Sequence, residues 1–216
     1  MKKLILISST LAVLAGSSAF AKTEGNYVTV DLHKAISETH RNTLIFGATP
    51  DDVTKYTGQN TSLGASYKYA FNFDKIFLAP GIFYERIGTK VMTTDGGNES
   101  SMSVNNRRGA RLDLGYDFTN DFAAYVTAGI TSTSYRTAHG DADGFGTAQS
   151  NQKFRGNKTG YLYGIGFTTN IAKDVSIGAE YNTQMLKVKS LHVVSGNDTR
   201  FKNRIDLYKV TLAYHF

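Results

Sequence analysis

Apolar and polar residues alternate with a period of two along most of the chain, a pattern typical of β-strands. The segment 109–118 is the clearest example, because Leu112, Leu114, Tyr116 and Phe118 share one face while charged residues and glycine occupy the other. Eight segments show this alternation, and they span 26–34, 62–71, 75–87, 109–118, 122–132, 160–169, 175–185 and 205–216. The pattern predicts eight strands, each with one apolar face and one more polar face.

The connections between these segments alternate between short and long. Short connections with Asn or Asp, which favour tight turns, lie at 72–75, 119–121 and 170–174. Long polar stretches lie at 35–60, 88–107, 134–158 and 187–203. This layout indicates an all-β fold: an eight-stranded antiparallel transmembrane β-barrel with short periplasmic turns and four long extracellular loops. A soluble β-sandwich is the alternative, but it does not need polar residues so regularly opposite the apolar face.

The first residues have the features of a secretory signal peptide. The chain begins with the basic sequence MKK, continues with an apolar run over 4–16, and reaches small residues at Ala19 and Ala21. The run is too short to span a membrane, and the order of these parts predicts cleavage after Ala21. We therefore expect a signal peptide at 1–21 and an exported barrel domain at 22–216, located in the outer membrane of a bacterium.

The last strand runs to the final residue of the sequence. In lipid every backbone donor and acceptor needs a partner, so this strand is expected to pair with the first and close the barrel. Tyr214 and Phe216 then lie at the periplasmic interface, where aromatic rings are favoured. The terminal Tyr-x-Phe also resembles the signal that outer-membrane barrels present to the barrel assembly machinery.

Composition excludes some classes of protein and partner. The chain has 216 residues, a net charge of +6 and no cysteine, which fits one exported domain that does not rely on disulfides. A basic chain that also carries 13 tyrosines and 13 phenylalanines suggests nucleic-acid binding in other contexts. Export argues against that partner, and we expect no nucleic acid.

Six charged residues fall on the polar faces of predicted strands and therefore point into the barrel. They are Lys68, Glu85, Arg111, Asp113, Glu180 and Lys209. The interior of an eight-stranded barrel is just wide enough for side chains to fill, and buried charges need partners. Two interpretations remain open: a static salt-bridge plug, or a narrow ion path with a gate.

No arrangement of residues indicates catalysis, a cofactor or a metal. His33, close to Asp31 near the end of the first strand, is the only histidine placed as a candidate general base. No serine motif accompanies it, and covalent catalysis requires a positioned nucleophile and base. We therefore expect no enzyme activity and no cofactor.

The last long loop keeps its alternation beyond the expected membrane zone, which predicts a raised β-hairpin over 186–207. Its basic residues, the candidate ligand-binding set, are Lys187, Lys189, His192, Arg200, Lys202 and Arg204. A basic hairpin favours acidic ligands, such as a heparin-like glycan or an acidic segment of a serum protein. Contact with lipopolysaccharide phosphates is the alternative.

With its signal peptide, eight strands and terminal Tyr-x-Phe, the chain resembles the small outer-membrane proteins of the OmpA-barrel and OmpX type, and most of all the rickettsial and alphaproteobacterial surface adhesins. Nothing follows Phe216 that corresponds to the peptidoglycan-binding domain of full OmpA. The resemblance implies a surface protein in outer-membrane lipid and lipopolysaccharide. It also implies an adhesin that binds host cells or serum proteins such as vitronectin. The alternatives are a structural barrel without a ligand, a lipid A-modifying enzyme and a narrow pore.

Overall fold

A computed structural model describes residues 24–43, 54–95, 98–141, 152–191 and 198–216. The expected signal peptide at 1–21 lies outside the described residues. No helix in the described part of the chain is long and apolar enough to cross a membrane.

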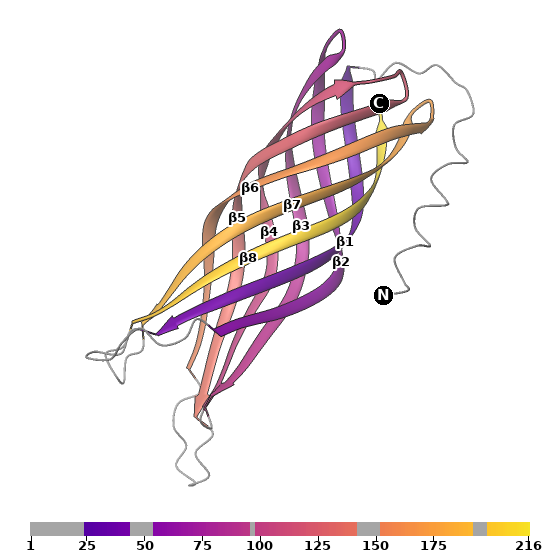
Figure 1. Cartoon of the computed structure of the whole chain (residues 1–216). Helices are drawn as coiled ribbons and strands as arrows, with labels where there is room; N and C mark the ends of the chain where they lie inside the picture. Colours follow the sequence, from indigo (N-terminus) through magenta and orange to yellow (C-terminus); the bar gives the residue numbers. More distant parts are fainter. Residues whose placement is uncertain (1–23, 44–53, 96–97, 142–151, 192–197) are drawn as a thin grey trace.

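Eight antiparallel strands form one closed barrel in which each strand pairs with its neighbours in sequence and β8 pairs with β1 (Figure 1). The strands are β1 (Gly25–Thr43), β2 (Thr54–Phe73), β3 (Ile76–Asp95), β4 (Asn98–Asp117), β5 (Phe122–Asp141), β6 (Gln152–Ala172), β7 (Val175–Leu191) and β8 (Asp198–His215). The predicted fold class is confirmed. We call the end of the barrel with the short β2–β3, β4–β5 and β6–β7 connections the turn end, and the opposite end the loop end.

The outer wall carries a continuous apolar band toward the turn end. Val30, Leu112, Ile130 and Val210 are all exposed on it, as expected for side chains that contact lipid rather than water. The last residue completes the closure, because the Phe216 amide donates to the Asn26 carbonyl oxygen across 3.1 Å and the Phe216 carbonyl oxygen accepts from the Asn26 amide at 3.2 Å.

The strands are longer than the sequence pattern predicts. They run for 17 to 21 residues, and most of each stretch predicted as a long loop belongs to a strand. The prediction of strand ends was wrong because, above the apolar band, the outer face of the strands becomes largely polar while apolar residues continue on the inner face among polar ones. The pattern that marked the strands by an apolar outer face therefore ends there, while the backbone ladder continues.

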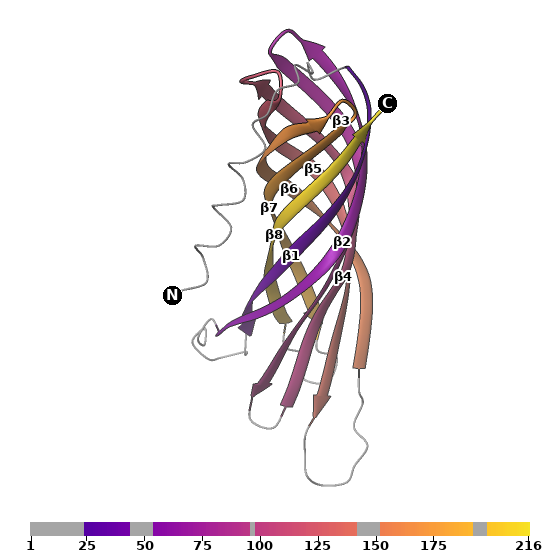
Figure 2. The same ribbon diagram turned by 90° about the vertical axis from the view of Figure 1, so that its right-hand side faces the viewer.

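Two strand pairs lose their ladder before the loop end. β2 and β3 stay paired only as far as Gly64 and Glu85, and β6 and β7 only as far as Tyr161 and Met185. The other six pairs continue toward the loop end. The strands therefore spread into two groups, β7–β8–β1–β2 and β3–β4–β5–β6, at the loop end (Figures 1 and 2).

Side chains replace the missing ladder between β2 and β3. Asn60 Nδ2 donates to the Ile87 carbonyl oxygen across 3.0 Å, and His33 Nε2 lies 2.8 Å from the Arg86 carbonyl oxygen. β3 bulges just after Arg86, where Gly88 has a φ of 65°, a conformation that favours glycine. The bulge exposes these two carbonyl groups to side-chain donors.

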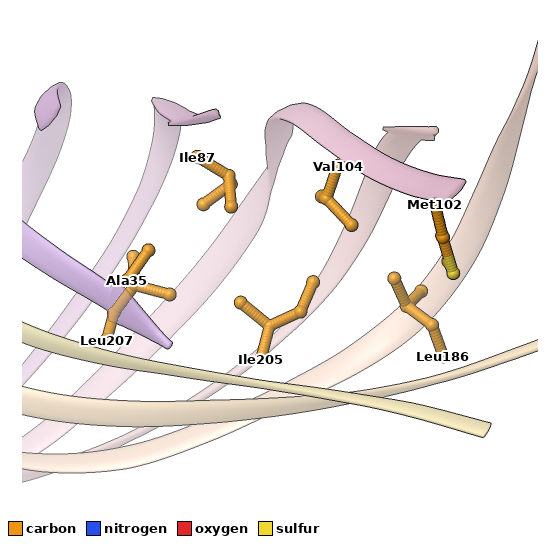
Figure 3. Close-up of a cluster of buried hydrophobic side chains, with 7 residues drawn as sticks. All are labelled: Ala35, Ile87, Met102, Val104, Leu186, Ile205 and Leu207. Atoms are coloured by element: carbon orange, nitrogen blue, oxygen red, sulfur yellow. The ribbon is translucent and has the colours of Figure 1, made fainter. Parts of the chain in front are cut away.

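The barrel interior is layered along its axis. Toward the turn end lies an apolar cluster of Tyr27, Ala70, Phe77, Ala79, Ala123 and Tyr125. Toward the loop end a second cluster joins side chains from β1, β3, β4, β7 and β8 that point toward one another (Figure 3), namely Ala35, Ile87, Met102, Val104, Leu186, Ile205 and Leu207. Charged side chains fill the space between the two clusters.

Candidate functional site

The charged layer is centred on Arg111 of β4. Its guanidinium donates to Glu180 of β7 at 3.1 and 2.7 Å and to Asp113 of its own strand at 2.9 Å from two nitrogens. Asp113 also accepts from Lys68 at 3.2 Å, and Glu180 lies 3.0 Å from Lys209 Nζ. A planar guanidinium that meets two carboxylates in this way fixes their positions as well as their charge.

Glu85 of β3 is the second centre of the layer. It accepts from Lys209 and from Arg107, and all three groups are buried. The structure thus brings together all six charged residues that the alternation placed on inward faces. Arg107 also donates to Asn182 at 2.5 Å and to Gln184 at 3.4 Å.

Arg107 was missed in the sequence because it falls in a stretch predicted as a loop. The available signal was its spacing: Arg107 lies four residues before Arg111 and six before Asp113, so all three share one face if the strand continues. A buried arginine requires charged partners. The residues predicted to point inward gave Glu85 too few cationic neighbours, so a further cation near it was to be expected.

Asp31 and His33 complete the charged layer on β1. Nδ1 of the imidazole lies 2.6 Å from an Asp31 carboxylate oxygen, and Nε2 is held by the Arg86 carbonyl oxygen. Both ring nitrogens are therefore engaged by oxygen atoms of the protein. The residue considered as a general base acts in this structure as a link between strands.

The carboxylates of the layer are paired, and the layer leaves little free space. Glu85, Asp113 and Glu180 form ion pairs with Lys68, Arg107, Arg111 and Lys209, while Asp31 pairs with His33. The cavity between them has a volume of about 30 Å³, enough for a water molecule. Among the described residues no group of histidine and acidic side chains is arranged to hold a metal ion.

The basic residues of the β7–β8 hairpin form the second candidate site. The strand register places Lys187 opposite Lys202 and Lys189 opposite Arg200, so residues of like charge occupy opposed register positions on the hairpin. Lys202 is exposed. The side chains of Lys187, Lys189 and Arg200, and all of His192, lie outside the described residues.

Arg204 differs from the other basic residues of the hairpin. Its Nε donates to Asp206 at 3.0 Å and a terminal nitrogen donates to the Tyr181 hydroxyl at 3.0 Å. The Tyr181 hydroxyl in turn donates to Asp206 at 2.9 Å. Arg204 is therefore already paired within the barrel wall and is less available to a ligand.

The comparisons with known proteins agree on the fold. The family model described as the outer membrane protein beta-barrel domain matches residues 7–216, and no curated protein matches the chain in sequence. Among solved structures, OprG of Pseudomonas aeruginosa has 15% identity and a TM-score of 0.63, over 91% of this chain and 98% of OprG.

Two other solved structures also match most of the chain. The outer membrane protease OmpT of Escherichia coli has 8% identity and a TM-score of 0.52, over 94% of this chain and all (100%) of OmpT. Ail, the attachment invasion locus protein of Yersinia pestis, has 14% identity and a TM-score of 0.45, over 90% of this chain and 100% of Ail. At these identities the likeness to OprG and OmpT concerns the fold alone. Because the family model covers nearly the whole sequence, the chain belongs to the outer-membrane protein β-barrel domain family and is a β-barrel of the bacterial outer membrane.

Proposed function

We propose that this barrel is a surface adhesin that binds an anionic ligand on host cells or on a serum protein, vitronectin being the first to test, through the extracellular β7–β8 hairpin. The observation that carries the proposal is the register of the hairpin, which sets Lys187 opposite Lys202 and Lys189 opposite Arg200. Like charges directly opposite one another on a sheet are destabilising. An anion bound between them relieves that repulsion.

The interior favours a binding role over transport. Ion pairs fill the middle of the barrel, and apolar clusters lie on both sides of them. A ligand therefore meets the protein on the extracellular extension of the strands. We further propose that the protein is not a lipid A-modifying enzyme, since both nitrogens of His33 are engaged; unchanged lipid A masses in a deletion strain are the expected result.

The test is binding of the refolded barrel to host cells and to immobilised vitronectin, at low and raised salt. A heat-dependent gel shift first establishes that the barrel is closed. The variant Lys187→Glu/Lys202→Glu removes one opposed basic pair, and we expect it to lose saturable, salt-sensitive binding. Its matched control, Lys75→Glu/Lys173→Glu, makes the same change of charge at the periplasmic turns, where we expect no effect.

Three results decide against the hairpin as the binding site of an adhesin. Binding no greater than that of an unrelated eight-stranded barrel leaves a purely structural outer-membrane protein as the better account. Binding that is equal for the hairpin variant and its control places the contact elsewhere. Loss of binding to lipopolysaccharide but not to host ligands identifies the hairpin as a lipid-phosphate contact instead.

A further inference from the structure

The extracellular part of β6 has a partner strand on one side only. β5 pairs with β6 without a break from Phe122 opposite Thr169 to His139 opposite Gln152. The β6–β7 ladder, in contrast, ends at Tyr161. Residues 152–160 of β6 therefore form a strand edge without a ladder partner on the β7 side. Such an edge is a template for a further strand.

The register shows which backbone groups this edge presents. The Asn170 amide donates to the Asp121 carbonyl oxygen across 2.9 Å, which makes the even-numbered residues of β6 the ones that bond to β5. Since the register has no shift along β6, the odd-numbered residues Arg155, Asn157 and Thr159 direct N–H and C=O groups to the open edge. All three are exposed.

The outer face of the edge carries an uncompensated pair of cations. Arg155 lies directly opposite Arg136 of β5, and neither forms an ion pair within the described part of the chain. The buried Nε of Arg136 has no hydrogen-bond partner. The cross-strand neighbour of Arg136 on β4 is Ser103, so no carboxylate stands beside the pair on either strand.

The inner face of the same edge is aromatic. Tyr135 lies across Gly156, and a Cβ atom added to that glycine would be 2.9 Å from the tyrosine hydroxyl oxygen. Tyr135 also packs against the apolar cluster nearest the loop end. Because Gly156 has no side chain, the ring covers the backbone next to the open edge. An apolar side chain of an added strand meets the ring there.

We propose that residues 153–159 of β6 bind an extended segment of a partner protein by strand addition, and that this segment alternates acidic and apolar residues. Its backbone completes the hydrogen bonds of Arg155, Asn157 and Thr159. Its acidic side chains, on the outer face, lie beside Arg155 and Arg136, while its apolar side chains face Tyr135. A sulfated glycan matches the charge of the arginines but not the row of backbone donors and acceptors. The inference rests on the proposed binding role and adds a second contact with a defined partner chemistry.

The experiment measures fluorescence anisotropy of a labelled synthetic nonapeptide of alternating Glu and Val, added to the full-length barrel in nanodiscs. Thr159→Pro removes one N–H group from the open edge and leaves the ladder with β5 intact. Proline is tolerated at the edge of a sheet. Thr159→Val keeps that N–H and is the matched control. We expect Thr159→Pro to weaken binding by about tenfold or more and Thr159→Val to leave it within about twofold.

Backbone methylation of the peptide tests the mode of binding directly. Methyl groups on alternate nitrogens block one edge of the peptide, so two versions with opposite phase block opposite edges. We expect one methylated version to lose binding and the other to keep it. Arg155→Glu should weaken binding of the unmodified peptide and of the methylated version that still binds. Equal binding by both methylated versions, or by Thr159→Pro and Thr159→Val, overturns the proposal, as does absence of peptide binding. Host-cell binding by the same preparation is measured separately, so failure of strand addition is distinguished from failure of the adhesin role.

Discussion

The imidazole of His33 reaches across the barrel interior to the carbonyl oxygen of Arg86, with 2.8 Å between Nε2 and the oxygen. It thereby joins β1 to β3, although β2 lies between them in the sheet. The contact stands just above the last ladder pair of β2 and β3, at Gly64 and Glu85. A side chain therefore holds the seam where backbone pairing ends.

Replacement of His33 by alanine is expected to open this seam. The variant leaves the Arg86 carbonyl oxygen and the Asp31 carboxylate without their partner, and a buried polar group left unpaired costs about 1–3 kcal/mol. Urea unfolding of the barrel in micelles measures the loss, and hydrogen exchange of amides 58–64 locates it. His33→Gln retains a donor of similar reach and should lose less. Equal stability of His33→Ala and the parent protein contradicts the role.

Removal of Arg107 is expected to cost more than removal of its neighbour in sequence. Arg107→Met leaves Glu85 with Lys209 as its only cation among the described residues and removes a donor from Asn182. Breaking a buried ion pair in this way costs about 3–5 kcal/mol. Arg108 is exposed on the outer wall, so Arg108→Met should change stability by less than about 0.5 kcal/mol. The same unfolding experiment compares the two, and similar losses exclude a special role for Arg107.

Alternation predicted the direction of side chains better than the extent of strands. It placed the apolar faces on the outside and the six charged residues from Lys68 to Lys209 on the inside, because the pleat fixes direction two residues at a time. It could not reveal Arg107 or the seam at Arg86. The position at which a ladder ends depends on the register between strands, which is set only when the barrel closes. Gly88 was the only local sign of the bulge in the sequence.

The closed interior predicts that the purified barrel conducts no ions. Arg111 and Lys209 both contact Glu180 in the middle of the lumen, and the cavity that these side chains line is only about 30 Å³. Planar bilayer recordings should therefore remain at the baseline while a porin recorded in the same way shows steps. Steady unitary currents that change size in Arg111→Ala favour the gated ion path over the salt-bridge plug.

Substitution of Phe216 distinguishes assembly of the barrel in the cell from stability of the folded barrel. Its backbone closes the sheet through two hydrogen bonds with Asn26, and these survive in Phe216→Ala. Its ring is exposed to the lipid side and belongs to the terminal Tyr-x-Phe. In refolding experiments the alanine variant should lose only about 1–2 kcal/mol, the order expected for a partly buried aromatic ring. We propose that the assembly machinery reads the ring itself, and we therefore expect a larger effect in cells. The heat-shifted, folded form in outer-membrane fractions should fall well below that of Tyr208→Ala, a matched change on the same face of β8. Equal amounts of folded protein from the two variants show that the terminal aromatic residue acts only through lipid contact.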